Sequence, residues 1–334
     1  MLTKRENFLE TIHGGSPEHF VDNFEYLTLF FDPISLGVLN RGNVQPDVPF
    51  QNAWGVWELL GTDEPGVMPL CDDEHKLIKD VCEWQSYLNE PRLIYSDEEW
   101  APCIEQVNAI DRNETFAAPF LANGIFEKLH YFMGMEDAMC NFYEEPEAMV
   151  DLIEYISDFE VKQAEEIVRH VHPDAIFHHD DWGSQRNSFL SPEMFDEFIK
   201  PAYDKIYGFW KENGVEVLVH HSDSYAANLV PSMIDMGIDV WQGAIRENDL
   251  PALVGQYGGQ ISFMGGLNNG IYDKPETTAD ELEAGFRELL DACPNQGRHF
   301  LIPGLTMGEP GSVFKHVYPL ATEVIYKLSA EYFA

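Results

Sequence analysis

Short apolar runs alternate with longer amphipathic segments along the chain, most regularly after residue 170. Short runs rich in Val, Ile and aromatic residues predict strands, whereas apolar positions recurring every three or four residues predict helices. The longest helical pattern covers residues 144–170, where Met149, Leu152 and Ile156 recur at this spacing. We predict strands at residues 24–29, 115–122, 174–177, 215–220, 238–241, 261–264 and 299–302, and helices at residues 76–88, 125–132, 144–170, 226–236, 251–256, 278–292 and 311–332.

Local signals mark several helix ends. Thr3 and Glu6 form a capping-box pattern, which predicts a short N-terminal helix. Ser191 followed by Pro192 predicts another helix start, and Pro201 should kink or divide that helix. The alternation of strands and helices indicates parallel βα units, and so many units in succession favour a closed barrel. We therefore expect an α/β protein with a (β/α)8 TIM barrel, formed by residues 1–334 as a single domain with a helical and irregular N-terminal extension.

The charge balance narrows the classes of partner. The 334 residues include 58 acidic and 20 basic side chains, which gives a net charge of −38 at pH 7. Nucleic-acid binding needs clustered Lys and Arg, and an anionic membrane would repel such a chain, so we expect neither partner. Two interpretations of the acidic surface stay open, namely a coat that keeps the protein soluble and an attraction to a partner with a basic face.

The five cysteines contain no CxxC pair, which is typical of thiols in a reducing cytosol. The N-terminus lacks a signal-peptide pattern, and no apolar run reaches transmembrane length. We expect a soluble, cytoplasmic protein.

Polar residues gather where the predicted strands end. The octet at residues 178–185 follows the strand at 174–177 and precedes the helix start at Ser191. In an α/β barrel the carboxyl ends of all strands meet at one mouth, where catalytic groups converge. Four other predicted strands are followed by polar or glycine-containing segments, at residues 220–223, 242, 265–269 and 303–306. These segments together form the candidate site.

Several of these features also have a structural interpretation. His221 and Asp223 are two positions apart, so on an extended chain they point to the same side and could bind a divalent metal. An Asp223 that orients a neutral His221 is equally open. Asp180 and Asp181 could instead cap the following helix. The glycines at 265–266 fit either a close backbone approach or a tight turn.

Four motifs carry a resemblance to a known family: Asp-Asp-Trp-Gly at 180–183, Leu-Ser-Pro-Glu-Met-Phe at 190–195, Val-His-His-Ser-Asp at 219–223 and Met-Gly-Gly-Leu-Asn at 264–268. On these residues the chain resembles the uroporphyrinogen decarboxylase superfamily. The resemblance covers essentially the whole chain. Its motifs are specific in the C-terminal half, and the match is loose before about residue 115. It implies a (β/α)8 barrel with its site at the carboxyl ends of the strands.

The superfamily includes two chemistries. Uroporphyrinogen decarboxylases bind a tetrapyrrole without a cofactor and carry an arginine-bearing N-terminal motif. This chain has nine arginines, and none of them stands in such a motif. Corrinoid-dependent methyltransferases use zinc held by a His-x-Cys pair and a later Cys. His221 matches that histidine, whereas Asp223 and Leu305 stand at the two cysteine positions, so a thiolate-rich site is ruled out. The candidates for a further ligand are His179, Asp180 and Glu309.

The resemblance favours a methyltransferase of one-carbon metabolism that moves a methyl group between a small methylated compound and a corrinoid protein. It implies cobalamin carried by that partner and a divalent metal, zinc, and a homodimer is one possible assembly. The alternatives are a cofactor-free decarboxylase of a porphyrinogen or another carboxylated ring, and a non-catalytic barrel that binds a small molecule or a corrinoid. We predict His179, Asp180, Asp181 and His221 as catalytic residues, Trp182, Gln185, Gln242, Gly265, Gly266 and Asn268 as substrate-binding residues, and His221 and Asp223 as metal ligands.

Overall fold

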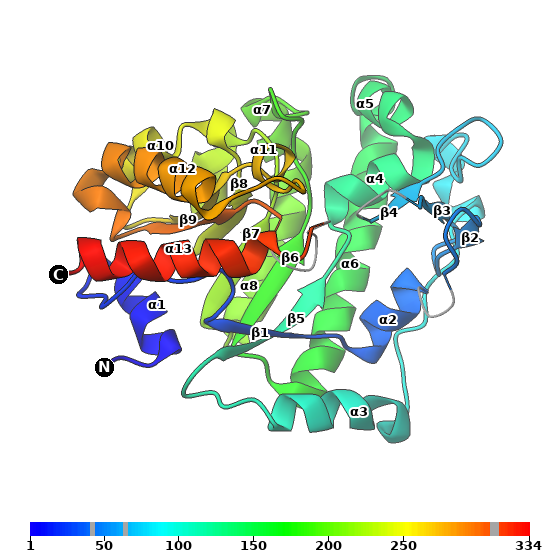
Figure 1. The fold of residues 1–334 in the computed structure, drawn as a ribbon. Coiled ribbons are helices and arrows are strands. Elements are labelled where there is room, and N and C mark those ends of the chain that lie inside the picture. The colour runs from blue at the N-terminus through cyan, green and yellow to red at the C-terminus, as the bar shows by residue number, and fades with distance from the viewer. Residues whose placement is uncertain (41–43, 63–65, 308–313) are drawn as a thin grey trace.

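The computed structural model describes residues 1–40, 44–62, 66–307 and 314–334 (Figure 1). Seven strands form one parallel sheet in the order β1-β5-β6-β7-β8-β9-β10. Each lies within a few residues of a predicted strand, which confirms the α/β class and the succession of βα units. The strands are β1 (Leu27–Phe30), β5 (Phe116–Leu121), β6 (Ala175–His179), β7 (Val217–His221), β8 (Val240–Ala244), β9 (Ser262–Leu267) and β10 (Leu301–Leu305).

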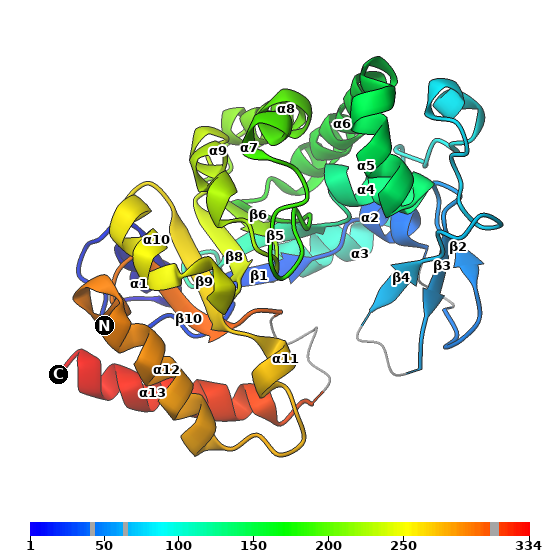
Figure 2. The ribbon, with the colours of Figure 1, turned by 90° about the horizontal axis from the view of Figure 1, so that it is seen from above.

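The sheet curls so that helices cover its outer face (Figure 2). Within the described residues β1 pairs with β5 and β10 with β9, and no strand joins these two edges. Closure into an eight-stranded barrel is therefore not confirmed. The helices are α1 (Lys4–Ile12), α2 (Pro33–Leu39), α3 (Asp97–Asn108), α4 (Ile125–Met133), α5 (Met135–Glu144), α6 (Pro146–Val171), α7 (Pro192–Met194), α8 (Lys200–Glu212), α9 (Val230–Asp235), α10 (Leu250–Tyr257), α11 (Asn269–Tyr272), α12 (Ala279–Ala292) and α13 (Val317–Tyr332).

The helix predicted after Ser191 becomes irregular just before Pro201, where a kink or division was predicted. α7 is followed by a π-helical turn, η2 (Phe195–Ile199), and α8 then begins with Pro201 in its first turn. Proline has no N–H to donate, so the hydrogen-bond ladder cannot continue regularly through it. Short 3-10 helices complete this half of the chain at η3 (Ala227–Leu229), η4 (Arg246–Asn248) and η5 (Pro294–Gly297).

The region between residues 40 and 115 differs most from the prediction. The helix predicted at residues 76–88 is only a 3-10 helix, η1 (Val81–Ser86). A small antiparallel sheet of β2 (Phe50–Gln51), β3 (Trp57–Leu60) and β4 (Val67–Pro69) was not predicted, and neither was α3, whose interior contains Pro102. These strands are too short to give a period-2 pattern. The predicted start of the last helix, Gly311, lies outside the described residues.

Side chains alternate across the curled sheet, so a separate core forms on each face. Phe177 of β6 and Val219 of β7 belong to the inner core, which Phe8 and Ile12 of α1 also join. Ile176 and Leu218, one position earlier on the same strands, belong to the larger core between sheet and helices. Each strand position thus has a fixed face. No helix in the described part of the chain has the length and apolar composition needed to cross a membrane.

Candidate active site

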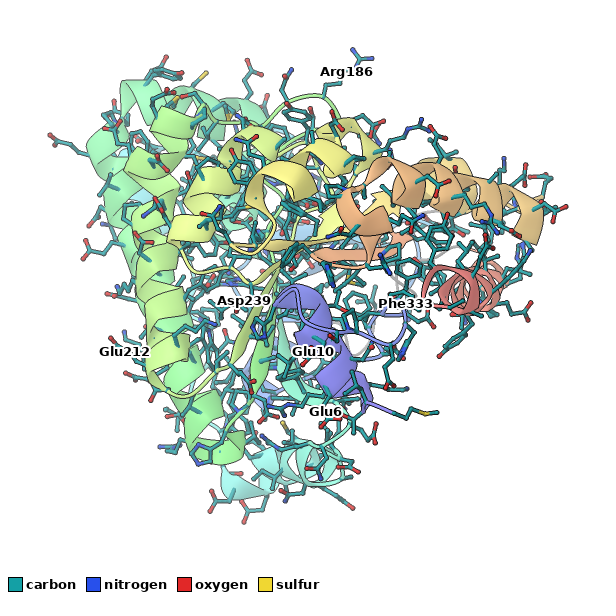
Figure 3. All side chains as sticks on the ribbon, turned by 90° about the vertical axis from the view of Figure 1, so that its left-hand side faces the viewer. Glu6, Glu10, Arg186, Glu212, Asp239 and Phe333 are labelled. Carbon is teal, nitrogen blue, oxygen red and sulfur yellow. The ribbon has the colours of Figure 1, made fainter. Side chains whose placement is uncertain are left out.

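The register of β6 and β7 places four histidines in two pairs. His178 lies opposite His220, and His179 lies opposite His221. His179 and His221 continue the inner face after Phe177 and Val219, whereas His178 and His220 continue the outer face. The site lies at the carboxyl ends of the strands. Arg186, on the loop after β6, marks this end of the molecule, and Glu6 of α1 lies towards the other end (Figure 3).

The outer pair serves packing. The main-chain carbonyl of Asp180 can only accept, so His220 Nε2–H donates to it at 3.2 Å, and His220 Nδ1 accepts from the Tyr207 hydroxyl at 2.7 Å. The His220 ring also stacks on Trp182, with centroids 3.8 Å apart. Burial lowers the pKa of His220 well below its usual value, so the ring is neutral.

Each histidine of the inner pair, His179 and His221, is oriented by a hydrogen bond from its Nδ1 to a neighbouring side chain. His179 Nδ1 lies 2.7 Å from Glu127 Oε2 on α4. His221 Nδ1 is hydrogen-bonded to Gln242 Oε1, and Gln242 Nε2 donates to the Thr306 carbonyl at 2.8 Å. Because each Nδ1–H donates to an oxygen, each Nε2 is left to bind a ligand. The two rings stack with centroids 4.4 Å apart.

Asp181 completes a group that could hold a metal ion. Possible ligand atoms of His179, Asp181 and His221 all lie within 4.8 Å of one another. β7 ends at His221, so the alternation that predicted a His221–Asp223 pair does not extend to Asp223. The Asp223 main-chain N–H donates to Asp181 Oδ1 at 2.9 Å, which places it beside the group. Asp223 as a ligand stays a prediction, and Glu309 lies outside the described residues.

Burial and neighbouring charges shift the pKa values of all three side chains in this group. Burial lowers the pKa of His179, but the charge and hydrogen bond of Glu127 outweigh this and raise it to about 10. Burial, with the charge of Asp223 added, raises the pKa of Asp181 well above its usual value. Burial and the charge of His179 lower the pKa of His221 to about 3. Burial thus disfavours the charged form of Asp181, while Glu127 favours the charged form of His179. Two nitrogens and an oxygen are donors that suit a divalent metal.

Asp180 has a different environment from Asp181. Its carboxylate accepts from the main-chain N–H groups of Phe126 and Glu127 at 2.9 and 2.8 Å, from Trp182 Nε1 at 2.9 Å and from the Tyr203 hydroxyl at 2.6 Å. Burial and the charge of Glu127 raise its pKa to about 7, against the effect of these donors.

Asp180 therefore caps α4 from a neighbouring strand, which places Glu127 against His179. Gly124, the residue before α4, permits this approach, because a Cβ there would lie 2.3 Å from the Asp180 Cβ. The sequence left open that Asp180 caps the helix that follows it; instead Asp180 caps α4, which precedes it in the chain, and Ser191 caps the following helix.

The predicted substrate-binding residues occupy varied positions. Trp182 is buried against His220, Gln185 is exposed, and Gln242 stands behind His221. A Cβ on Gly265 would lie 2.5 Å from the Ala244 carbonyl oxygen, and one on Gly266 2.5 Å from Leu289 Cδ2, so both glycines allow close packing. Contact of these residues with a substrate stays a prediction.

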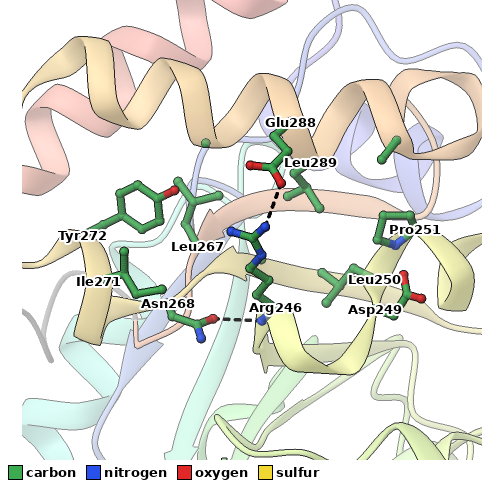
Figure 4. A pocket seen from close by; sticks show the side chains of 13 residues that line it. Arg246, Asp249, Leu250, Pro251, Leu267, Asn268, Ile271, Tyr272, Glu288 and Leu289 are labelled. Carbon is green, nitrogen blue, oxygen red and sulfur yellow. Dashed lines mark hydrogen bonds and ion pairs between the residues drawn. The ribbon is translucent and has the colours of Figure 1, made fainter.

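Asn268 lies beside a separate cavity of about 250 Å³ between α10, α11 and α12 (Figure 4). Its Oδ1 accepts from the Arg246 main-chain N–H at 2.8 Å, and the Arg246 guanidinium pairs with Glu288 at 2.7 Å. None of His179, Asp181 and His221 lines this cavity. Asn268 is thus engaged in contacts away from the histidine pair.

Sequence reasoning missed Glu127, and it predicted Gln242 as a substrate-binding residue without its hydrogen bond to His221. Glu127 lies in a predicted helix rather than after a strand, yet it is 5% exposed. The one available signal was the Glu127-Lys128 pair inside the otherwise apolar stretch Ile125–Met133, where a charged pair on a buried helix must find partners.

Residues 113–308 match the uroporphyrinogen decarboxylase (URO-D) family. The chain belongs to this family. Among solved structures, a methyltransferase from Methanosarcina mazei is similar, with a TM-score of 0.63 and 13% identity over 98% of this chain and 99% of that chain. This likeness concerns the fold, and it extends over the whole sheet and its helices. Comparison with curated proteins gives no match.

Proposed function

We propose that this member of the URO-D family is a methyltransferase that moves a methyl group between a small methylated compound and a corrinoid protein. The observation that carries the proposal is the convergence of His179, Asp181 and His221, in which Glu127 and Gln242 already hold the Nδ1 atoms of the two histidines. Such a group suits activation of a leaving atom, which methyl transfer requires.

A divalent metal, zinc in our proposal, fits the donors at this place. His179 and His221 would hold it through nitrogen and Asp181 through oxygen, with Asp223 as the remaining predicted ligand. A bound metal would act as a Lewis acid on the leaving atom. Leu305, at one of the family's cysteine positions, is buried and has no ligand atom, so the shell is harder than a thiolate site.

The chain's own residues then have distinct roles. Glu127 and Gln242 fix the tautomers and the orientation of the two histidines. Burial raises the pKa of Asp181, so its carboxyl group must be deprotonated before its oxygen can hold a metal. Asp180 has a positioning role, because its carboxylate accepts hydrogen bonds from the N-terminus of α4 and so holds Glu127 in place.

The electrostatics of the site favour this function over tetrapyrrole decarboxylation. A porphyrinogen carries several carboxylates, each of which needs a charge-assisted partner when buried. Around the histidine pair the neighbouring charges are the carboxylates of Glu127, Asp181 and Asp223. Arg246, at the end of β8, is already paired with Glu288. A cofactor-free decarboxylase of a porphyrinogen is therefore the weaker candidate.

Elemental analysis and a corrinoid assay together test the proposal. Purified protein should hold close to one equivalent of a divalent metal, and it should convert cob(I)alamin to methylcobalamin with a panel of methylated amines, ethers and thioethers, followed by absorbance. His221→Ala should lose both properties, whereas His13→Ala, an exposed histidine after α1, should keep them. Metal below about a tenth of an equivalent and unchanged in His221→Ala, or steady formation of coproporphyrinogen from uroporphyrinogen, would overturn it.

A further inference from the structure

A small polar cavity lies on the outer face of β6, on the opposite side of the sheet from His179 and His221. It has a volume of about 20 Å³ and is lined by residues of β5, α4, α6, β6 and α8. The polar side chains that line it are Asn123, Lys128, Glu160, Gln163, His178 and the Trp210 indole. All of these except Asn123 are less than a tenth exposed.

The charges at this cavity are already balanced. Lys128 Nζ lies 2.6 Å from Glu160 Oε1 and also donates to the Asn123 carbonyl. Gln163 Nε2 donates to the Ser35 hydroxyl at 2.9 Å, so the amide is fixed from the other side. An ionic ligand would disturb this balance, whereas a neutral one would not.

Two buried polar atoms of the residues that line the cavity have no hydrogen-bond partner in the described part of the chain. His178 Nε2 lies 3.4 Å from Glu160 Oε2, and because a carboxylate oxygen accepts, Nε2 carries the proton that faces it. His178 Nδ1 then offers a lone pair, for which the described residues supply no donor. Trp210 Nε1–H likewise lacks an acceptor in the described chain. One atom needs a proton and the other needs a lone pair.

We propose that this cavity binds a single water molecule that accepts from Trp210 Nε1–H and donates to His178 Nδ1. The volume suits one water, which needs at least about 10–15 Å³ and usually makes about three hydrogen bonds to buried polar groups. Glu160 and Gln163 line the same cavity and offer acceptors for its second proton. Only a molecule that both donates and accepts satisfies both orphan atoms.

The water would join β6 to α8 at the residue next to His179. It would also keep His178 in the Nε2–H form that faces Glu160, and so hold the end of β6 against the helical layer. The inference does not depend on the proposed function, because none of its residues belongs to the group of His179, Asp181 and His221.

Nuclear magnetic resonance of the ¹⁵N-labelled full-length protein tests this directly. The Trp210 indole proton, assigned with Trp210→Phe, should show a cross-peak to a long-lived water. Trp54 and Trp100 serve as matched controls, because their indole Nε1 atoms are also buried without a partner but do not line this cavity. They should show no such cross-peak.

A second variant tests the role of His178. In His178→Leu, which keeps Trp210 but removes the acceptor, the Trp210 water cross-peak should disappear while the other indole signals show that the fold is retained. Absence of the cross-peak in the unchanged protein, or its persistence in His178→Leu, would overturn the proposal. If His178→Leu does not fold, the His178 Nδ1 chemical shift of the unchanged protein decides, since a hydrogen-bonded nitrogen supports the water and a free one contradicts it.

Discussion

At the scale of single residues, the orientation of His179 and His221 depends on hydrogen bonds to Glu127 and Gln242, which are not among the proposed metal ligands. Gln242 is held by the Thr306 carbonyl and so presents its oxygen to His221. Glu127 does the same for His179 from another element. Partners of this kind set the tautomer and basicity of a metal-binding histidine.

Replacement of Gln242 should weaken metal binding without removing any ligand. We expect Gln242→Leu to lower zinc affinity by about 10- to 100-fold, because His221 loses the acceptor that fixes its tautomer. Gln242→Glu keeps an acceptor and should retain most of the affinity. Competition with a chelator measures both, with Gln185→Leu on the exposed loop as control. Equal affinities for all four proteins would exclude a positioning role for Gln242.

Metal binding should also depend on pH. The pKa of His179 is raised to about 10 in the metal-free protein, so the ring is protonated at pH 7 and must lose its proton to bind a metal. Affinity should therefore rise as pH increases towards about 10, and binding should release at least one proton. Calorimetric titration with Co²⁺ in buffers of different ionisation enthalpy counts that proton. An affinity that does not change between pH 6 and 8 would contradict the prediction.

At the scale of elements, Asp180 joins three of them. It lies after β6, caps the start of α4 and accepts from Tyr203 of α8. The sequence could place Asp180 after a strand, but it could not say which helix would present N–H groups to it. Neighbouring Asp181 shares the same local pattern and faces the histidines instead.

Asp180→Ala should destabilise the protein strongly. The change leaves two main-chain N–H groups, an indole and a hydroxyl buried without an acceptor, and we expect a loss of about 3 kcal/mol in the free energy of unfolding. Thr278→Ala, which removes the capping box of the exposed α12 start, should cost only about 1 kcal/mol. Urea unfolding followed by circular dichroism compares the two variants. A smaller loss for Asp180→Ala than for Thr278→Ala would argue against the capping role.

At the scale of the whole molecule, the net charge of −38 governs how a protein partner approaches. Histidines and amide side chains are numerous at the ends of the strands, but Asp181 and Asp223 are also partly exposed there. A corrinoid protein that docks over these ends would meet repulsion from the rest of the surface unless its own rim is basic.

Added salt should therefore speed methyl transfer to a cognate corrinoid protein modestly. Salt screens the repulsion between two acidic proteins, and the Debye length falls to ~8 Å at physiological ionic strength. Second-order rate constants measured from low to moderate sodium chloride test this, with free cob(I)alamin as the control acceptor. A steep fall in rate with the protein partner alone would instead identify the acidic surface as a steering device.

The sequence by itself determined the α/β class, the positions of the seven parallel strands and the gathering of polar residues at their ends, because these follow from local periodicity. It also placed His179, Asp181 and His221 among the candidate residues. Only the tertiary structure decided that His179 and His221 share the inner face, since this depends on the register of β6 against β7. The contributions of Glu127 and Gln242, and the different roles of Asp180 and Asp181, likewise depend on packing between distant segments, which no local pattern contains.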